Sequence, residues 1–136
     1  MTDFRAVTES FSVSPQITAA DVAAAATQGF TLIINNRPDG EAAGQPSGAE
    51  IGAAAAEAGL AYAYIPVTGR PTAEQAMAVR DAVGGAGGKV LAFCRSGTRS
   101  ILAWTMAEAA DGRRSNDELV RLGAGAGYDV SGALRG

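Results

Sequence analysis

The sequence predicts an α/β fold in three layers, with helices on both faces of a central, mostly parallel sheet of about four to five strands. The first observation is that short β-branched runs alternate with alanine-rich stretches of helical length. The second is that glycine and proline separate these segments at regular intervals. Buried strands joined through helices favour right-handed crossovers, and therefore parallel neighbours.

A length of 136 residues with 47% hydrophobic content suits one compact core. We interpret residues 1–10 as an N-terminal extension and residues 11–136 as a single domain. The N-terminus has no leader pattern, and no apolar run approaches the roughly 18 residues that span a bilayer. We therefore expect a cytoplasmic protein with no membrane partner.

Strands and helices alternate through the first half of the chain. Residues 11–14 are a first or edge strand, and Thr18 caps a helix over residues 19–27 that ends at Gly29. The apolar run 31–35 predicts a buried strand. A turn-rich loop follows, with the sequence Asn36-Arg37-Pro38-Asp39-Gly40-Glu41.

The same alternation continues in the middle of the chain. Ser47 and Glu50 form a capping box for a helix that ends near residue 58. Residues 61–65 are the third strand, and Thr72 caps a helix over residues 73–83.

The last third begins with a short buried strand over residues 89–93. The loop that starts at Cys94 leads into a mostly apolar helix over residues 100–110. Two further helices are predicted, one capped by Ser115 and a short one from about residue 130.

Three of the predicted loops share one rim of the sheet. Ligands of such sheets bind beyond the carboxyl ends of the strands. The loops after the strands that end at Asn35, Ile65 and Phe93 therefore bring together a set of polar residues: Arg37, Asp39, Glu41, Thr68, Arg70 and the segment 94–100.

The composition excludes several kinds of chemistry. One cysteine and no histidine allow no internal disulfide and no conventional zinc or iron site, so we expect no metal and no cofactor. Catalysis must then use a thiolate, a carboxylate, a hydroxyl or arginine. A net charge of −3 without a basic run argues against a nucleic-acid partner, and nothing in the sequence specifies an oligomeric state.

The segment after the last strand has the features of an anion-binding loop. Successive backbone N–H groups can form a nest there, and the following helix adds the positive end of its dipole. Gly97 permits a positive φ, and Arg99 can donate two hydrogen bonds to one oxyanion. These features favour a thiolate nucleophile over a merely buried structural cysteine. The predicted loop comprises Cys94, Arg95, Ser96, Gly97, Thr98, Arg99 and Ser100.

Ser100 has two interpretations. Its hydroxyl could hydrogen-bond the thiolate or assist a leaving sulfur, or it could cap the helix that begins at Ile101. The two roles are compatible.

Cys94-Arg-Ser-Gly-Thr-Arg-Ser100 resembles the active-site loop of rhodanese-type sulfurtransferases and, more loosely, the phosphate loop of cysteine-dependent tyrosine phosphatases. From about Phe11 the chain is similar to a bacterial family of candidate phosphatases, also described as beta-lactamase-hydrolase-like sulfur transferases. Asn35-Asn-Arg-Pro-Asp-Gly-Glu41 and Ala126-Gly-Tyr-Asp129 contribute to this similarity. The resemblance implies a dual-specificity-phosphatase-like fold that carries sulfur-transfer chemistry.

Two features of the sequence depart from a phosphatase. Phosphatases place their arginine six positions after the cysteine, whereas Arg99 is five after Cys94, and the resulting smaller ring of amides suits a persulfide or thiosulfate. A phosphatase also needs an acid to protonate the leaving oxygen, and loop 66–71 contains none. Asp39 or Glu41 could replace it, although Pro38-Asp39-Gly40 is also an ordinary turn sequence.

We therefore predict a cysteine-dependent sulfurtransferase, because sulfur transfer needs no strong general acid. Cys94 would take sulfur from thiosulfate or a low-molecular-weight persulfide and pass it to a thiol, for which the resemblance suggests glutathione. Arg95, Arg37 and Arg70 are candidates for steering these molecules, alongside ordinary surface roles. The alternatives are a cysteine-dependent phosphatase and a non-catalytic anion or persulfide sensor.

Overall fold

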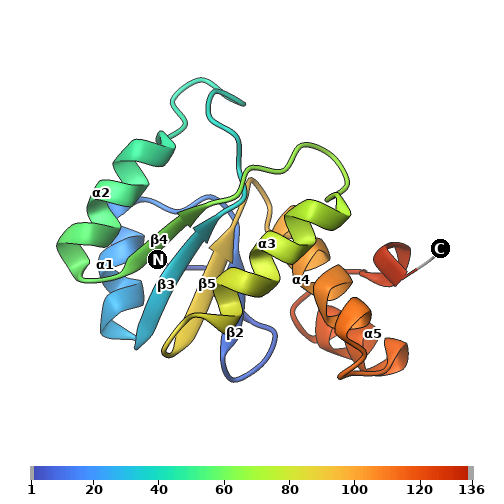
Figure 1. Ribbon diagram of the computed structural model, residues 1–136. Helices are drawn as coiled ribbons and strands as arrows, with labels where there is room; N and C mark the ends of the chain where they lie inside the picture. Colours follow the sequence, from blue (N-terminus) through green and yellow to red (C-terminus); the bar gives the residue numbers. More distant parts are fainter. Residues whose placement is uncertain (1, 135–136) are drawn as a thin grey trace.

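Five strands form one sheet in the order β1-β2-β5-β3-β4, in a computed structural model that describes residues 2–134 (Figure 1). All neighbouring strands pair in parallel except β1, which pairs with β2 in the antiparallel direction. The predicted α/β class and mostly parallel sheet are confirmed. The strands are β1 (Arg5–Ala6), β2 (Phe11–Ser14), β3 (Phe30–Asn35), β4 (Ala61–Tyr64) and β5 (Lys89–Phe93).

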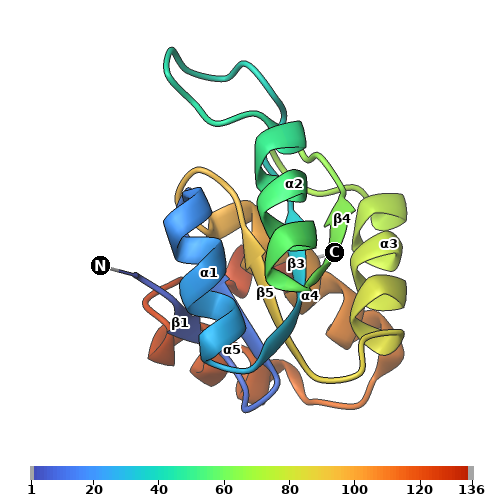
Figure 2. The same cartoon turned by 90° about the vertical axis from the view of Figure 1, so that its left-hand side faces the viewer.

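Helices cover both faces of this sheet and complete the three layers (Figures 1 and 2). One face is covered by α1 (Ala19–Thr27) and α2 (Gly48–Ala58). The other face is covered by α3 (Ala73–Gly84), α4 (Thr98–Asp111) and α5 (Asn116–Gly125). A short 3-10 turn, η1 (Ser131–Leu134), follows α5 and lies against α4.

Strand β5 separates two apolar cores. Val90 and Ala92 belong to the cluster shared with α3, α4 and α5, while Leu91 and Phe93 belong to the cluster shared with α1 and α2. Successive side chains of a strand point to opposite faces, so a central strand between two helical layers must be apolar throughout. The sequence satisfies this condition directly before Cys94.

Local capping signals fix the starts of the helices. Thr18, Ser47 and Thr72 each accept a hydrogen bond from the backbone N–H three residues later, and each belongs to a complete capping box. Ser115 accepts from the Glu118 N–H in the same way. The predicted N-caps of these four helices are therefore confirmed.

Two parts of the fold differ from the expectations. Residues 5–6 pair with β2 and Val7 is buried in the core, so the segment predicted to be an extension contributes an edge strand. Helix α4 begins at Thr98 rather than near Ser100. A two-residue strand has no periodicity to detect, and the N-cap of α4 is Gly97, which has no side chain to signal it.

The loops after β3 and β5 leave the sheet toward opposite faces. The β3 loop leads to α2 on one face, and the β5 loop leads to α4 on the other. A crevice opens at the carboxyl edge of a parallel sheet where neighbouring connections diverge in this way. The backbone N–H of Asn36 donates to the carbonyl of Phe93 at 2.8 Å, which joins the two loops at their base.

Candidate active site

Cys94 lies at the end of β5, on the floor of a loop whose rim is exposed. Its side chain is 0% exposed, whereas Arg95, Ser96 and Thr98 are exposed. The backbone N–H of Gly97 donates to Cys94 Sγ at 3.1 Å. The loop therefore curls back over the sulfur and presents at least one amide to it.

Helix α4 directs its N-terminus into this loop. Its N-cap, Gly97, provides no side-chain hydrogen bond, and no acidic residue lies in the first turn. The first amides of a helix have no partner within the helix, and the dipole places partial positive charge there. The start of α4 is thus open to an anion bound over Cys94.

Gly97 is required here for two independent reasons. Its φ is +92°, in the left-handed region that favours glycine. A Cβ at this position would also overlap the hydroxyl of Tyr128. Tyr128 covers the loop and donates from that hydroxyl to the carbonyl of Ser96 at 2.7 Å.

Arg99 is held in a fixed orientation beside the loop. Its Nη1 and Nη2 donate to the two carboxylate oxygens of Glu41 at 2.7 and 2.8 Å, and Nη1 also donates to the carbonyl of Val67 at 2.6 Å. Bidentate pairing of this kind fixes the plane of a guanidinium. The pairing with Glu41 raises the pKa of Arg99, and the neighbouring Cys94 adds to the rise. The structure thus brings a permanent cation next to the sulfur.

Arg37 supports this arrangement from inside the protein. Its side chain is buried; Nε donates to Glu41 Oε1 at 3.0 Å and Nη1 donates to Gln16 Oε1 at 3.0 Å. The backbone N–H of Gln16 in turn donates to the carbonyl of Arg95 at 3.2 Å. Arg37 therefore orients Glu41, and through it Arg99, instead of steering a substrate from the surface.

Glu41 is ionised at neutral pH in this setting. Hydrogen bonding to Arg99, aided by Arg37, lowers the pKa of Glu41 from 4.5 to about 2. A carboxylate in this state has no proton to give to a leaving group. Its role in the structure is to position Arg99.

This pairing predicts how stability depends on pH. A carboxylate with a depressed pKa in the folded state contributes stability that is complete above its unfolded pKa and is lost as the pH falls through the folded value. For Glu41 the window runs from 4.5 down to about 2. At neutral pH we expect Glu41→Gln to lower the free energy of unfolding by about 1–2 kcal/mol, an amount reduced by solvent screening.

Denaturant unfolding at several pH values measures this contribution. The difference in unfolding free energy between wild type and Glu41→Gln should shrink below about pH 4. The exposed control Glu9→Gln should leave the free energy of unfolding at neutral pH unchanged. If the difference in unfolding free energy between wild type and Glu41→Gln stayed constant down to about pH 2, the lowered pKa of Glu41 would be contradicted.

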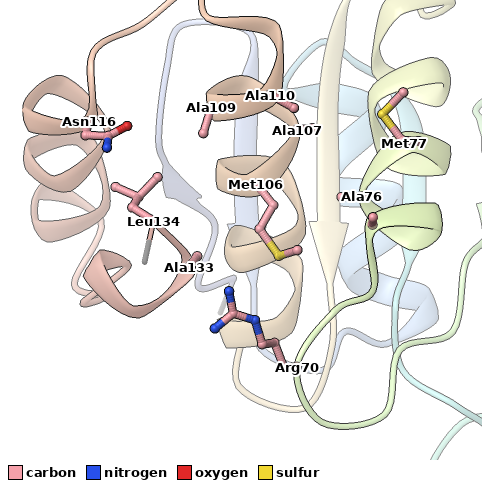
Figure 3. Close-up of a pocket in the computed structure, with 11 residues that line it drawn as sticks. Arg70, Ala76, Met77, Met106, Ala107, Ala109, Ala110, Asn116, Ala133 and Leu134 are labelled. Carbon is pink, nitrogen blue, oxygen red and sulfur yellow. The ribbon is translucent and has the colours of Figure 1, made fainter. Parts of the chain in front are cut away.

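Asp39 and Arg70 lie on the predicted rim but have other partners. The Asp39 carboxylate accepts from the backbone N–H of Gly48, the first residue of α2, at 2.7 Å. Arg70 donates to the carbonyl of Gly132 at 3.0 Å. It lies at one end of a cavity of about 460 Å³ between α3, α4 and η1, lined mainly by alanine, methionine and leucine (Figure 3). None of the residues that line this cavity belongs to the Cys94 loop.

Ser100 lies in the first turn of α4, so it does not cap that helix. Its side chain is 0% exposed, and its hydroxyl has no hydrogen-bond partner within residues 2–134. An unpaired buried hydroxyl is costly to keep. No hydrogen bond within the described residues therefore engages the Ser100 hydroxyl.

Replacing Ser100 by alanine should lower turnover about tenfold while changing the free energy of unfolding by less than about 0.5 kcal/mol, because no hydrogen bond of the fold is lost. Thr105→Val is the matched control, since Thr105 Oγ1 is equally buried and unpaired farther along α4. Steady-state rates and denaturant unfolding of both variants test this. Equal losses of activity in the two variants would exclude a specific role for Ser100.

The sequence assigned no role in the site to three contributors: Tyr128, which lies in the family-like segment 126–129, the side chain of Gln16 and the carbonyl of Val67. Tyr128 lies 32 residues beyond its partner Ser96, so no local spacing connects them. A backbone carbonyl carries no sequence signal at all. For Gln16 the available signal was its position two residues after β2, on the same edge of the sheet.

Within residues 2–134, no three or more histidine, cysteine, aspartate or glutamate side chains gather closely enough to hold a metal ion. No helix in the same range has both the length and the apolar character to cross a bilayer.

Comparisons with known proteins agree on the family of this sequence. The profile of the family described as "Beta-lactamase hydrolase-like protein, phosphatase-like domain" matches residues 3–111. The beta-lactamase hydrolase-like protein of Agrobacterium fabrum is 37% identical over 131 residues, which are 95% of this chain and 30% of that protein. Its namesake from Xylella fastidiosa strain Temecula1 is 37% identical over 129 residues, 94% of this chain and 30% of the relative. The chain thus spans about 30% of the length of these relatives.

Solved structures agree on a cysteine-phosphatase-like fold. A candidate phosphatase from Neisseria meningitidis is 34% identical, with a TM-score of 0.85 over 97% of this chain and 94% of that one. Kinase-associated phosphatase has a TM-score of 0.72 at 13% identity, covering 98% and 90%. Pseudomonas aeruginosa TpbA, solved with phosphotyrosine, has a TM-score of 0.69 at 15% identity, covering 96% and 78%. These names support the phosphatase alternative more directly than the predicted sulfur transfer.

Proposed function

Since the chain belongs to the family of beta-lactamase hydrolase-like, phosphatase-like domains, we propose that it is a cysteine-dependent enzyme that transfers sulfur between small molecules. Cys94 is the nucleophile of this proposal. Arg99 and the amides at the start of α4 bind the anionic end of the donor. The fold is that of cysteine phosphatases, and the proposal concerns the reaction that this fold carries out here.

The state of the two candidate acids supports sulfur transfer over phosphate ester hydrolysis. Glu41 is ionised and paired with Arg99, and the Asp39 carboxylate accepts a hydrogen bond from the Gly48 N–H at the start of α2. Hydrolysis of a phosphate ester places negative charge on a leaving oxygen, which needs a proton donor. Sulfite and thiolate are stable anions and leave without one.

The proposed reaction has two steps. The Cys94 thiolate attacks the outer sulfur of thiosulfate; a new S–S bond forms at Cys94, the S–S bond of the donor breaks, and sulfite leaves with its electron pair. An acceptor thiolate, such as that of glutathione, then attacks the outer sulfur of the Cys94 persulfide. The acceptor becomes a persulfide and the Cys94 thiolate is restored, so the cycle needs no external oxidant or reductant.

Phosphate monoester hydrolysis is the second candidate, because the solved relatives carry phosphatase names and one was solved with phosphotyrosine. In that reaction Cys94 would form a phosphocysteine that water then hydrolyses. The loop with Arg99 five positions after Cys94 would have to hold the three oxygens of a phosphoryl group. A proton donor would have to come from the substrate or from solvent.

One pair of assays separates the two candidates. Intact-mass analysis after exposure to thiosulfate should reveal a gain of one sulfur atom, which is lost when glutathione is added. Because Cys94 is the single cysteine, the gain can be assigned without digestion. Turnover of p-nitrophenyl phosphate with no sulfur adduct would reverse the proposal. Reversible binding of thiosulfate without an adduct and without turnover of either substrate would favour a sensor.

A further inference from the structure

We propose that Tyr128 is a positioning residue for the Cys94 nucleophile and acts through the peptide bond between Ser96 and Gly97. The inference rests on the proposed function in one respect, namely that the Cys94 thiolate is the reacting group. It adds a residue from the C-terminal segment to a site built otherwise from the loops after the strands. It holds for sulfur transfer and for phosphate hydrolysis alike.

The Ser96–Gly97 peptide makes one hydrogen bond on each side. Its carbonyl oxygen accepts from the Tyr128 hydroxyl at 2.7 Å, and its N–H donates to Cys94 Sγ at 3.1 Å. The C=O and N–H of a trans peptide point in opposite directions from one rigid plane. Holding the carbonyl outward therefore aims the N–H inward at the sulfur.

A rotation of this peptide would destabilise a thiolate at Cys94. It would turn the Ser96 carbonyl, the negative end of the peptide dipole, toward Cys94 Sγ and remove the Gly97 donor. Glycine at position 97 makes such a rotation sterically accessible, because it has no Cβ to oppose it. The hydroxyl of Tyr128 supplies the restraint that the glycine lacks.

Tyr128 is itself held in place on both sides. The guanidinium of Arg5, in β1, lies 5.2 Å from the centre of its ring. Its hydroxyl fills the space that a Cβ at Gly97 would occupy. Burial raises the pKa of Tyr128, so the hydroxyl keeps its proton and can donate at neutral pH. The edge strand and the C-terminal segment thus support the nucleophile loop.

Tyr128→Phe tests the proposal, because it removes only the hydroxyl and keeps the ring under Arg5. At neutral pH we expect the rate of Cys94 alkylation by iodoacetamide to fall about three- to tenfold, with the whole pH profile of alkylation moved to higher pH. Tyr64→Phe is the matched control. It removes a hydroxyl that accepts a hydrogen bond from the Asp39 N–H on another loop, and it should alkylate like wild type.

Hydrogen exchange of the Gly97 amide, followed by NMR, provides a second measurement that needs neither alkylation nor turnover. The amide should exchange faster in Tyr128→Phe than in wild type or Tyr64→Phe. Unchanged exchange and an unchanged alkylation profile would overturn the proposal. Wild type that alkylates normally but turns over neither thiosulfate nor p-nitrophenyl phosphate would refute the proposed function alone, because the difference between the tyrosine variants would still be measured.

Discussion

Cys94→Ser should abolish both sulfur transfer and phosphate ester hydrolysis, with a loss of at least about 10⁴-fold in kcat, as expected when a nucleophile is removed. A serine hydroxyl is largely protonated at neutral pH and cannot hold the transferred sulfur as a persulfide. The variant should therefore gain no mass after exposure to thiosulfate. Steady-state rates and intact-mass analysis both check this.

The stability of Cys94→Ser shows whether a loss of activity comes from the missing thiol or from unfolding. A hydroxyl at this fully buried position keeps the Gly97 N–H as a partner, so we expect a loss of only about 1 kcal/mol in the free energy of unfolding. Circular dichroism and denaturant unfolding measure it. A folded Cys94→Ser variant that retains turnover would exclude every function based on this thiolate.

Arg99→Lys should lower kcat/KM by about 10²- to 10³-fold, although it preserves the positive charge. An ammonium group cannot donate in parallel to both oxygens of Glu41 while also presenting a second edge to a substrate anion. The loss should fall mainly on the thiosulfate half-reaction, because that donor carries the sulfonate. Rapid-quench rates of the two half-reactions, measured separately for wild type and Arg99→Lys, check this expectation.

Arg80→Lys is the matched control for this substitution. Arg80 is likewise an arginine held by ion pairs, in its case with Asp81 and Asp111, but it lies on α3 and away from the loop. Its replacement should leave kcat/KM within about twofold of wild type, as expected for a surface change. Similar losses in both variants would mean that Arg99 acts through stability rather than through the anion.

The strands and helices were predictable because their signals are local. Thr18, Ser47 and Thr72 mark helix starts through capping signals that span a single helical turn. The apolar strand before Cys94 indicates a central position in the sheet. The short edge strand β1 has no such signal. It exists only because β2 offers it a partner.

The roles of the acidic residues required the fold. Asp39 and Glu41 are two positions apart and looked alike as acid candidates in the sequence. In the structure one carboxylate meets the first amide of α2 and the other meets Arg99. The partner decides whether a carboxylate binds a helix amide, orients a guanidinium or carries a proton, and the two partners here lie 9 and 58 residues away along the chain.

Local patterns in the sequence were enough to predict the layered α/β architecture and the anion-binding character of the Cys94 loop, because alternation, capping and loop chemistry depend on neighbouring residues. The tertiary structure alone decided that Glu41 and Arg37 hold Arg99, that Arg70 faces a separate cavity, and that Tyr128 covers Gly97. Apart from the Arg37–Glu41 pair, which is four residues apart, each of these contacts joins residues that are distant in the sequence. Its geometry follows from how strands, loops and termini pack, a property that short-range sequence patterns do not encode.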